Sequence, residues 1–152
     1  EHVTNVDHYL GEIRRVLVPG GTLILVTPDR RTRLLPLQRP WNRWHVKEYS
    51  AHSLASVMRR TFPNVEMQLM SGRRDVIDVE LKRCNKLKWA TLPFTLPFLP
   101  DAARVGLLNL IHSLRGRPEL KSTQLEFDFD ESAIEIGPNL QPSLNLVAIA
   151  RT

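Results

Sequence analysis

Cysteine, aromatic residues and long apolar runs are all scarce in this sequence. Cys84 is the only cysteine among 152 residues, so no disulfide can form within the chain, and we expect a reducing, cytoplasmic compartment. Aromatic residues are 7% of the chain, which is few for a surface that stacks nucleic-acid bases. No apolar run is long enough to span a bilayer, and no secretory signal pattern is found. These absences argue against a disulfide-stabilised secreted domain and a transmembrane segment.

The remaining composition is that of one folded domain over residues 1–152. Apolar residues are 42% and charged residues 24%, which excludes wholesale disorder. Lysine and arginine total 21 against 16 acidic residues, and the net charge of +5 favours an anionic partner. Because the first residue is Glu1 rather than methionine, we expect the chain to follow processing or to come from within a longer protein.

Hydrophobic periodicity alternates between helix and strand over much of the chain. An amphipathic helix is predicted over 5–17, and the apolar, β-branched run 22–27 predicts a parallel strand buried on both faces. A second helix follows Ser50, and residues 64–71 alternate as a strand near a sheet edge does. A third strand is predicted over 144–150. The expected fold class is therefore α/β.

Two segments depart from this alternation. Residues 29–49 are irregular and basic, and residues 73–140 form an insertion that is partly helical. Three prolines in 92–100 exclude a regular helix there, and Asp101 is expected to cap a helix that runs to Arg115. The insertion could cover an apolar acceptor as a lid, lie on a membrane surface or pack on the sheet, and packing is favoured over membrane contact.

Three stretches resemble one enzyme family. They are Glu1-His2-Val3, the run GEIRRVLVPGGTLILVTP over 11–28, and His45-Val46-Lys47-Glu48-Tyr49-Ser50. Together they resemble the class I S-adenosylmethionine-dependent methyltransferases, and more narrowly the branch that acts on small molecules and lipids. The resemblance covers 1–72 and resumes at 144–151, whereas 73–140 matches no motif of the family.

The resemblance implies a particular sheet. In the family the strand order is 3-2-1-4-5-7-6, with strand 7 antiparallel. On that template residues 22–27, 64–71 and 144–150 are strands 5, 6 and 7. The expected fold is therefore a partial Rossmann-like methyltransferase sheet of order 5-7-6, in which the last strand lies antiparallel between the other two.

The family's cofactor loop is missing from this sequence. Relatives bind S-adenosylmethionine on a glycine-rich loop after strand 1 and on an acidic residue that ends strand 2, but the seven glycines here do not fit G-x-G-x-x-G spacing. The resemblance thus implies the C-terminal part of a methyltransferase. The intact protein would transfer a methyl group to a small or lipid-like acceptor, and this chain alone would neither bind the cofactor tightly nor be active.

Glu1 and His2 are the predicted catalytic residues, and the resemblance also places them beside the cofactor. His2 could take a proton from the acceptor while Glu1 orients it, or the two could hold a divalent cation as in some relatives. The alternative is that His2 only caps the following helix. The histidines and the cysteine show no zinc-binding spacing, so no metal site is predicted. Cys84 is interpreted as an incidental thiol, although its basic neighbours could lower its pKa.

The predicted acceptor-binding residues follow the strand 22–27, and they are Arg30, Arg31, Trp41, Trp44 and His45. Arginine could bind an anionic acceptor through paired donors, and the tryptophans could wall the acceptor's pocket. The alternative is that each arginine faces solvent and that the tryptophans pack against the helix after Ser50.

Two functions of other classes remain open. The net charge and the basic segment 29–49, which has a formal charge of +4, suit a nucleic-acid binder, although the acidic stretch 126–135 interrupts a basic groove. Alternatively, the chain is a non-catalytic module that self-associates, because strand 22–27 would expose an unpaired apolar edge without strand 4 beside it. The acceptor, the methylated atom and the oligomeric state are not predicted.

Overall fold

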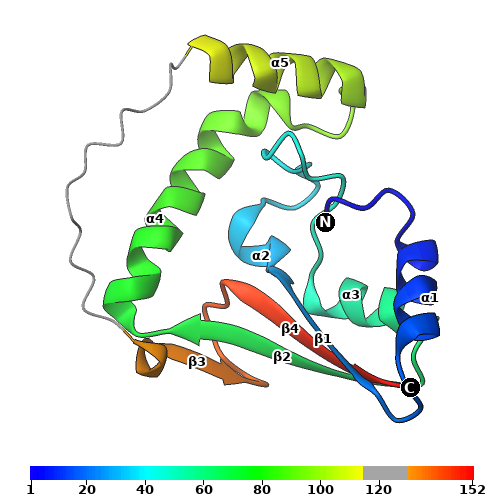
Figure 1. Ribbon diagram of the computed structural model, residues 1–152. Coiled ribbons are helices and arrows are strands. Elements are labelled where there is room, and N and C mark those ends of the chain that lie inside the picture. The colour runs from blue at the N-terminus through cyan, green and yellow to red at the C-terminus, as the bar shows by residue number, and fades with distance from the viewer. Residues whose placement is uncertain (115–129) are drawn as a thin grey trace.

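The computed structural model describes residues 1–114 and 130–152, which form one sheet with helices around it (Figure 1). The elements in chain order are α1 (Val6–Val16), β1 (Thr22–Pro28), α2 (Arg30–Arg33), α3 (Ala51–Met58), β2 (Asn64–Gly72), α4 (Arg74–Thr91), the 3-10 helix η1 (Leu92–Phe94), α5 (Asp101–Leu114), the 3-10 helix η2 (Glu131–Ala133), β3 (Ile134–Gly137) and β4 (Asn145–Arg151).

Short-range interactions fix where the first helix begins and ends. The side chain of Asn5 accepts a hydrogen bond from the backbone N–H of His8 at 3.1 Å, which satisfies one free donor of the first turn. The chain then turns into β1 through Gly20, whose φ of +74° is a left-handed conformation that suits glycine. A Cβ on Gly21 would lie 2.7 Å from the carbonyl oxygen of Val18, so this position also requires glycine.

The sheet has the order β1-β4-β2-β3, and every hydrogen-bonded pair of strands in it is antiparallel. In the middle of the sheet Ala148 of β4 lies between Leu25 of β1 and Met67 of β2. The α/β class is therefore confirmed, and β4 lies antiparallel between the two strands expected beside it. That this sheet is the 5-7-6 part of a Rossmann-like methyltransferase sheet stays a prediction.

Strand β1 differs from its prediction in burial and direction. Its partner β4 is antiparallel to it, and Ile24 and Val26 are 64% and 53% exposed, so the expectation of a parallel strand buried on both faces was wrong. Helices α1 and α3 contribute to the core on one face of the sheet. Leu23 and Leu25 of β1 pack against this core, so Ile24 and Val26, which alternate with them, lie on the other face of the sheet. In the described part of the chain, no strand pairs with the other edge of β1.

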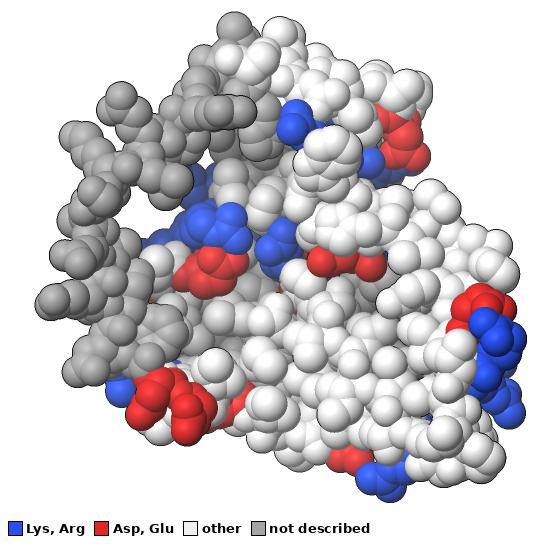
Figure 2. Space-filling view, viewed as in Figure 1, with Lys and Arg blue, Asp and Glu red and all other residues white. Residues whose placement is uncertain are grey.

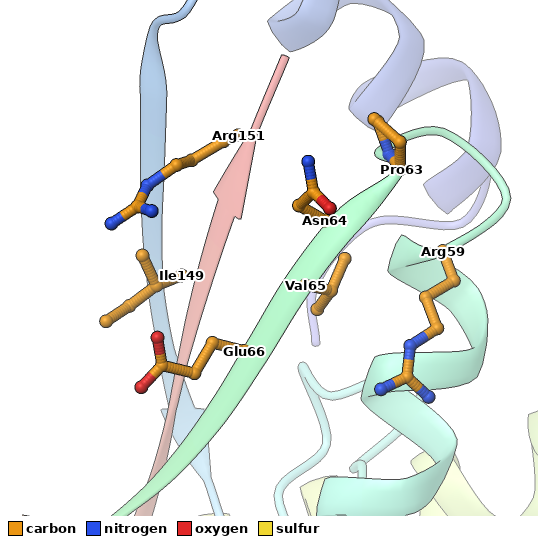
Figure 3. A pocket seen from close by; sticks show the side chains of 7 residues that line it. All are labelled: Arg59, Pro63, Asn64, Val65, Glu66, Ile149 and Arg151. Carbon is orange, nitrogen blue, oxygen red and sulfur yellow. The ribbon is translucent and has the colours of Figure 1, made fainter.

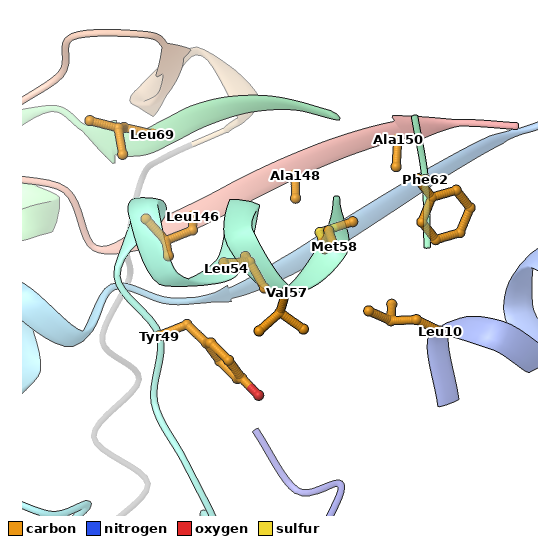
Figure 4. Close-up of a cluster of buried hydrophobic side chains, with 10 residues drawn as sticks. All are labelled: Leu10, Tyr49, Leu54, Val57, Met58, Phe62, Leu69, Leu146, Ala148 and Ala150. Carbon is orange, nitrogen blue, oxygen red and sulfur yellow. The ribbon is translucent and has the colours of Figure 1, made fainter. Parts of the chain in front are cut away.

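The hydrophobic core lies between the sheet and helices α1 and α3 (Figure 4). Leu146, Ala148 and Ala150 alternate along β4 and face this core, and none of the three is exposed. Their partners come from α1, α3 and the segment after α3, with Leu10, Met58 and Phe62 fully buried. Small alanines in the central strand leave room for α3 to lie close to the sheet.

The segment 73–140 is an elaboration that contributes to the sheet. Strand β3 pairs with residues 69–72 of β2, an addition that the sequence pattern did not predict. The helix expected from Asp101 to Arg115 is described as far as Leu114, and residues 115–129, which include part of the acidic stretch, lie outside the described residues. Among the helices in the described ranges, none has the length and apolar character needed to cross a membrane.

Candidate functional site

The first residues of the chain lie against the loop that joins α2 to α3 (Figure 1). The backbone N–H of Val46 donates to the carbonyl of Glu1 at 2.9 Å, and His2 Nδ1 donates to the carbonyl of Trp44 at 3.0 Å. These contacts bring the Glu1-His2 stretch and the His45 stretch together, although they are far apart in the sequence. We call Glu1, His2, His45 and Glu48 the histidine–carboxylate cluster.

His45 is the buried centre of this cluster. Its Nδ1 lies 2.9 Å from Glu48 Oε1 and 3.4 Å from Glu1 Oε2. Since carboxylates accept, Nδ1 bears the proton, and the neutral ring keeps its lone pair on Nε2. Burial lowers the pKa of His45, and the charges of Glu1 and Glu48 offset only part of this effect. The neutral ring, which can act as a base, is therefore favoured near neutral pH.

Glu48 fixes the orientation of His45 through a second buried partner. Its Oε2 accepts a hydrogen bond from Arg33 Nε at 3.2 Å, and the Glu48 side chain has no exposed surface. The Arg33 guanidinium lies 4.3 Å from the ring centroid of Trp41, and Trp41 Nε1 donates to the carbonyl of Arg33 at 3.2 Å. A buried chain of contacts thus runs from Trp41 through Arg33 and Glu48 to His45.

His2 is the exposed member of the cluster, with 56% of its side chain in contact with solvent. Its Nε2 lies 3.5 Å from Glu1 Oε1, and its ring meets that of His45 edge to face, with the centroids 4.7 Å apart. Helix α1 is capped by Asn5, so the alternative that His2 caps this helix is wrong.

The cluster lies at the carboxyl end of β1. The hydroxyl of Thr27 in that strand donates to Glu1 Oε2 at 3.5 Å. A cavity of about 40 Å³ beside Glu1 is bordered by Thr27 and Tyr49 among other residues.

Three members of the cluster lie close enough together to hold a cation. One ligand atom each from Glu1, His2 and His45 lie within 4.8 Å of one another. His45 Nδ1 already donates to the buried Glu48, so Nε2 is the nitrogen of His45 that is left for a metal. The spacing in the sequence did not predict this grouping, and we describe the cluster by the hydrogen bonds that its members form.

The predicted arginines point to partners outside the cluster. Arg31 forms an ion pair with the buried Asp29, with Nη2 and Oδ2 3.0 Å apart, and Arg30 Nη2 donates to the carbonyl of Gln38 at 3.0 Å. In the described part of the chain, no hydrogen bond or ion pair joins either arginine to His45. These contacts stabilise the start of α2 and the loop after it, and a role in acceptor binding stays a prediction.

The two tryptophans lie in different surroundings. Trp41 is half-buried, with the guanidiniums of Arg33 and Arg83 lying 4.3 and 5.5 Å from its ring centroid. Trp44 is 66% exposed and stacks with Arg43, whose guanidinium lies 4.8 Å from the indole centroid. Trp44 also borders a cavity of about 250 Å³ together with His45 and residues of helix α5.

Sequence reasoning missed the two residues that hold His45 in place. Glu48 was recognised only as part of a motif, and Arg33 only as one basic residue among several. The spacing of His45 and Glu48, three residues apart in a loop, is a usable signal because a carboxylate there can reach the imidazole. No comparable signal identifies Arg33, because its pairing with Glu48 depends on the path of the loop between them.

A separate hollow of about 440 Å³ lies where β2 begins and β4 ends (Figure 3). Arg59 and Arg151 border it together with Glu66, but in Figure 3 the two arginine side chains lie on opposite sides of β2. Its polar groups therefore do not converge on one point, and we do not consider it a functional site.

Cys84 is a buried thiol in helix α4. Burial raises its pKa to about 11, and a hydrogen bond with Glu80 acts in the same direction. The basic neighbours in the sequence therefore do not activate it, and its interpretation as an incidental thiol agrees with this environment.

No family model, no curated protein and no solved structure matches this chain in the comparisons.

Proposed function

We propose that this chain forms the acceptor-binding corner of an S-adenosylmethionine-dependent methyltransferase that methylates a small or lipid-like molecule. The main support is that the Glu1-His2 and His45-Glu48 stretches, recognised separately by their resemblance to that family, contact each other at the carboxyl end of β1. A strand order in which β4 lies antiparallel between β1 and β2 is consistent with the same proposal.

The residues present do not form a complete site for the cofactor. The sequence has no glycine-rich loop with G-x-G-x-x-G spacing, and Glu1 and His2 are the residues of this chain expected beside the cofactor. Methyl transfer depends strongly on how the acceptor is oriented. We assign this orienting role to the histidine–carboxylate cluster and the loop after α2.

Isothermal titration calorimetry with S-adenosylmethionine tests the proposal. The titration is carried out on this chain and on the natural protein from which it comes. We expect binding by the natural protein and little or none by the chain alone, because the cofactor loop is absent from the chain. If neither binds the cofactor, the assignment is wrong.

A nucleic-acid-binding function is less well supported by the geometry. Arg31, Arg33 and Arg39, all from the basic segment, each pair with a carboxylate. On the described part of the face in Figure 2, most basic groups lie next to acidic ones and do not form one broad basic surface. Filter binding across a salt series distinguishes the two functions, because phosphate contacts impose a steep dependence on salt concentration.

A further inference from the structure

The cavity of about 250 Å³ beside the cluster combines an apolar wall with basic groups. Trp44, Val46 and Val105 supply apolar surface, and Arg43 and Arg104 supply two guanidiniums. Arg104 is buried, with Nη1 donating to the carbonyl of Pro40 at 2.8 Å. Asp101, the acidic residue of the lining, forms ion pairs with Arg39 and with Arg104, so it neutralises part of the charge of Arg104. Arg43 is the guanidinium of the lining that has no acidic partner among the described residues.

His45 borders this cavity and has one nitrogen available. Its Nδ1 is occupied by Glu48, and no hydrogen bond to Nε2 is formed by any described residue. Every buried polar side-chain atom in the described residues has a partner, so the unpartnered Nε2 must be accessible to solvent. The charged and titratable groups around His45 and along the cavity are Glu1, His2, Arg33, Glu48, Arg43, Asp101 and Arg104.

We propose that this cavity binds a methyl acceptor with an ionisable hydroxyl on an apolar or aromatic body, that is, a phenol or an enol, and that His45 Nε2 takes the hydroxyl proton. This inference rests on the proposed function and names its acceptor class. The O–H bond breaks, its electron pair stays on oxygen, and the proton forms an N–H bond at Nε2. The resulting oxyanion is the nucleophile that methylation requires.

The groups around the cavity favour some acceptor classes over others. The guanidinium of Arg43 disfavours a cationic amine, whereas it stabilises an oxyanion. A carboxylic acid is already ionised at neutral pH and needs no base. An alkyl alcohol is a much weaker acid than a phenol or an enol, so an imidazole deprotonates it less readily. A phenolic or enolic hydroxyl remains as the group that this base can ionise.

Glu48 and Arg33 act as positioning residues for this proton transfer. Glu48 holds the proton on Nδ1, so the lone pair is on Nε2, and Arg33 keeps the carboxylate in place. His45→Gln removes the base. Glu48→Gln leaves the imidazole but weakens control of its tautomer. His52→Gln, which changes an exposed histidine on α3, is the matched control.

The test uses 4-nitrophenol as the probe, because its phenolate absorbs visible light and its protonated form does not. The full chain is titrated at a pH below the pKa of the free probe. We expect the pKa of the bound probe to fall by about one unit, a roughly tenfold rise in the ratio of phenolate to phenol. His45→Gln should abolish this rise, Glu48→Gln should reduce it, and His52→Gln should leave it unchanged.

Two measurements on the unmutated chain avoid any effect of substitution on folding. Nitrogen-15 NMR of the histidine rings should show His45 protonated on Nδ1, with the Nε2 signal moving when 4-nitrophenol is added. 4-Nitroanisole, which has no hydroxyl proton, should not move it in the same direction. Failure of 4-nitrophenol to bind, or a phenolate band unaffected by His45→Gln, would overturn the proposal.

This experiment is independent of the cofactor. A phenolate band that requires His45 supports the acceptor class even if the natural protein does not bind S-adenosylmethionine. Conversely, cofactor binding without a phenolate response would leave the proposed function intact and overturn the acceptor class.

Discussion

Glu48→Gln should be among the most damaging conservative substitutions in this chain. The substitution keeps the shape of the side chain but removes the charge that faces Arg33 Nε at 3.2 Å and His45 Nδ1 at 2.9 Å. Arg33 would then remain buried without its carboxylate. Removing one partner of a buried ion pair typically costs about 3–5 kcal/mol, and the partner left behind here is Arg33, whose side chain is 10% exposed.

Urea denaturation followed by circular dichroism measures this cost. A double-mutant cycle with Arg33→Gln tests its origin, because removing both charges should cost less than the sum of the two single substitutions. Glu12→Gln is the control, since Glu12 pairs with Arg15 at 2.8 Å on the exposed face of α1 and should contribute at most about 0.5 kcal/mol. The reasoning is refuted if Glu48→Gln costs less than about 1 kcal/mol or if the two substitutions are additive.

Further predictions concern backbone space, reactivity, pH and association. Gly11→Ala should stabilise α1 by about 0.5–1 kcal/mol, since nothing lies within 4 Å of the added methyl. Gly72→Ala should destabilise the fold, because its methyl would lie 2.5 Å from a backbone carbonyl oxygen. Urea denaturation of both variants checks the contrast. With its pKa raised from 9.0 to about 11, Cys84 should react with a thiol reagent at least about a hundredfold more slowly in the native chain than in urea, and equal rates would contradict its burial. Burial lowers the pKa of His45, so as the pH falls the unfolded chain binds a proton at this histidine before the folded chain does. The free energy of unfolding should therefore decrease from about pH 6.5 down to the pKa of the folded state. His45→Gln should flatten this slope. The open edge of β1 should pair with a second copy of this chain, so sedimentation should show dimers that Val26→Lys abolishes, and a clean monomer at high concentration would count against it.

Local features of the fold could be predicted because their causes lie within a few residues. Asn5 and Ser50 cap their helices through bonds to residues three positions later, so the sequence around them contains the whole signal. Strand β3 is different, because its four residues become a strand by pairing with β2, more than sixty residues earlier. The exposure of Ile24 and Val26 was also missed, since an apolar run indicates a strand but not how many of its faces are covered.

The candidate site was predictable in its components but not in its connections. Glu1, His2 and His45 were singled out by motif, and the structure brings all three together. The resemblance gave no such basis for Arg30 and Arg31, and the structure pairs them with Asp29 and a backbone carbonyl instead. Charge composition suggests that an arginine can bind an anion, but only the path of the chain decides which anion is nearest.

The position of His45 depends on the segment that matched no family motif. Gln38, in the loop that leads to His45, is buried, and its Nε2 donates to the carbonyl of Lys88 at 2.8 Å and to Thr95 Oγ1 at 2.9 Å. The carbonyl of Thr95 in turn accepts from the backbone N–H of Arg39 at 2.8 Å. Helix α4 and the segment after it therefore fix the loop through these hydrogen bonds. Residues at the start of α5 line the cavity that His45 borders. Under the proposed function, we therefore expect substitutions at Asp101, Arg104 or Val105 to change which molecules the cavity binds without altering the hydrogen bonds of the cluster.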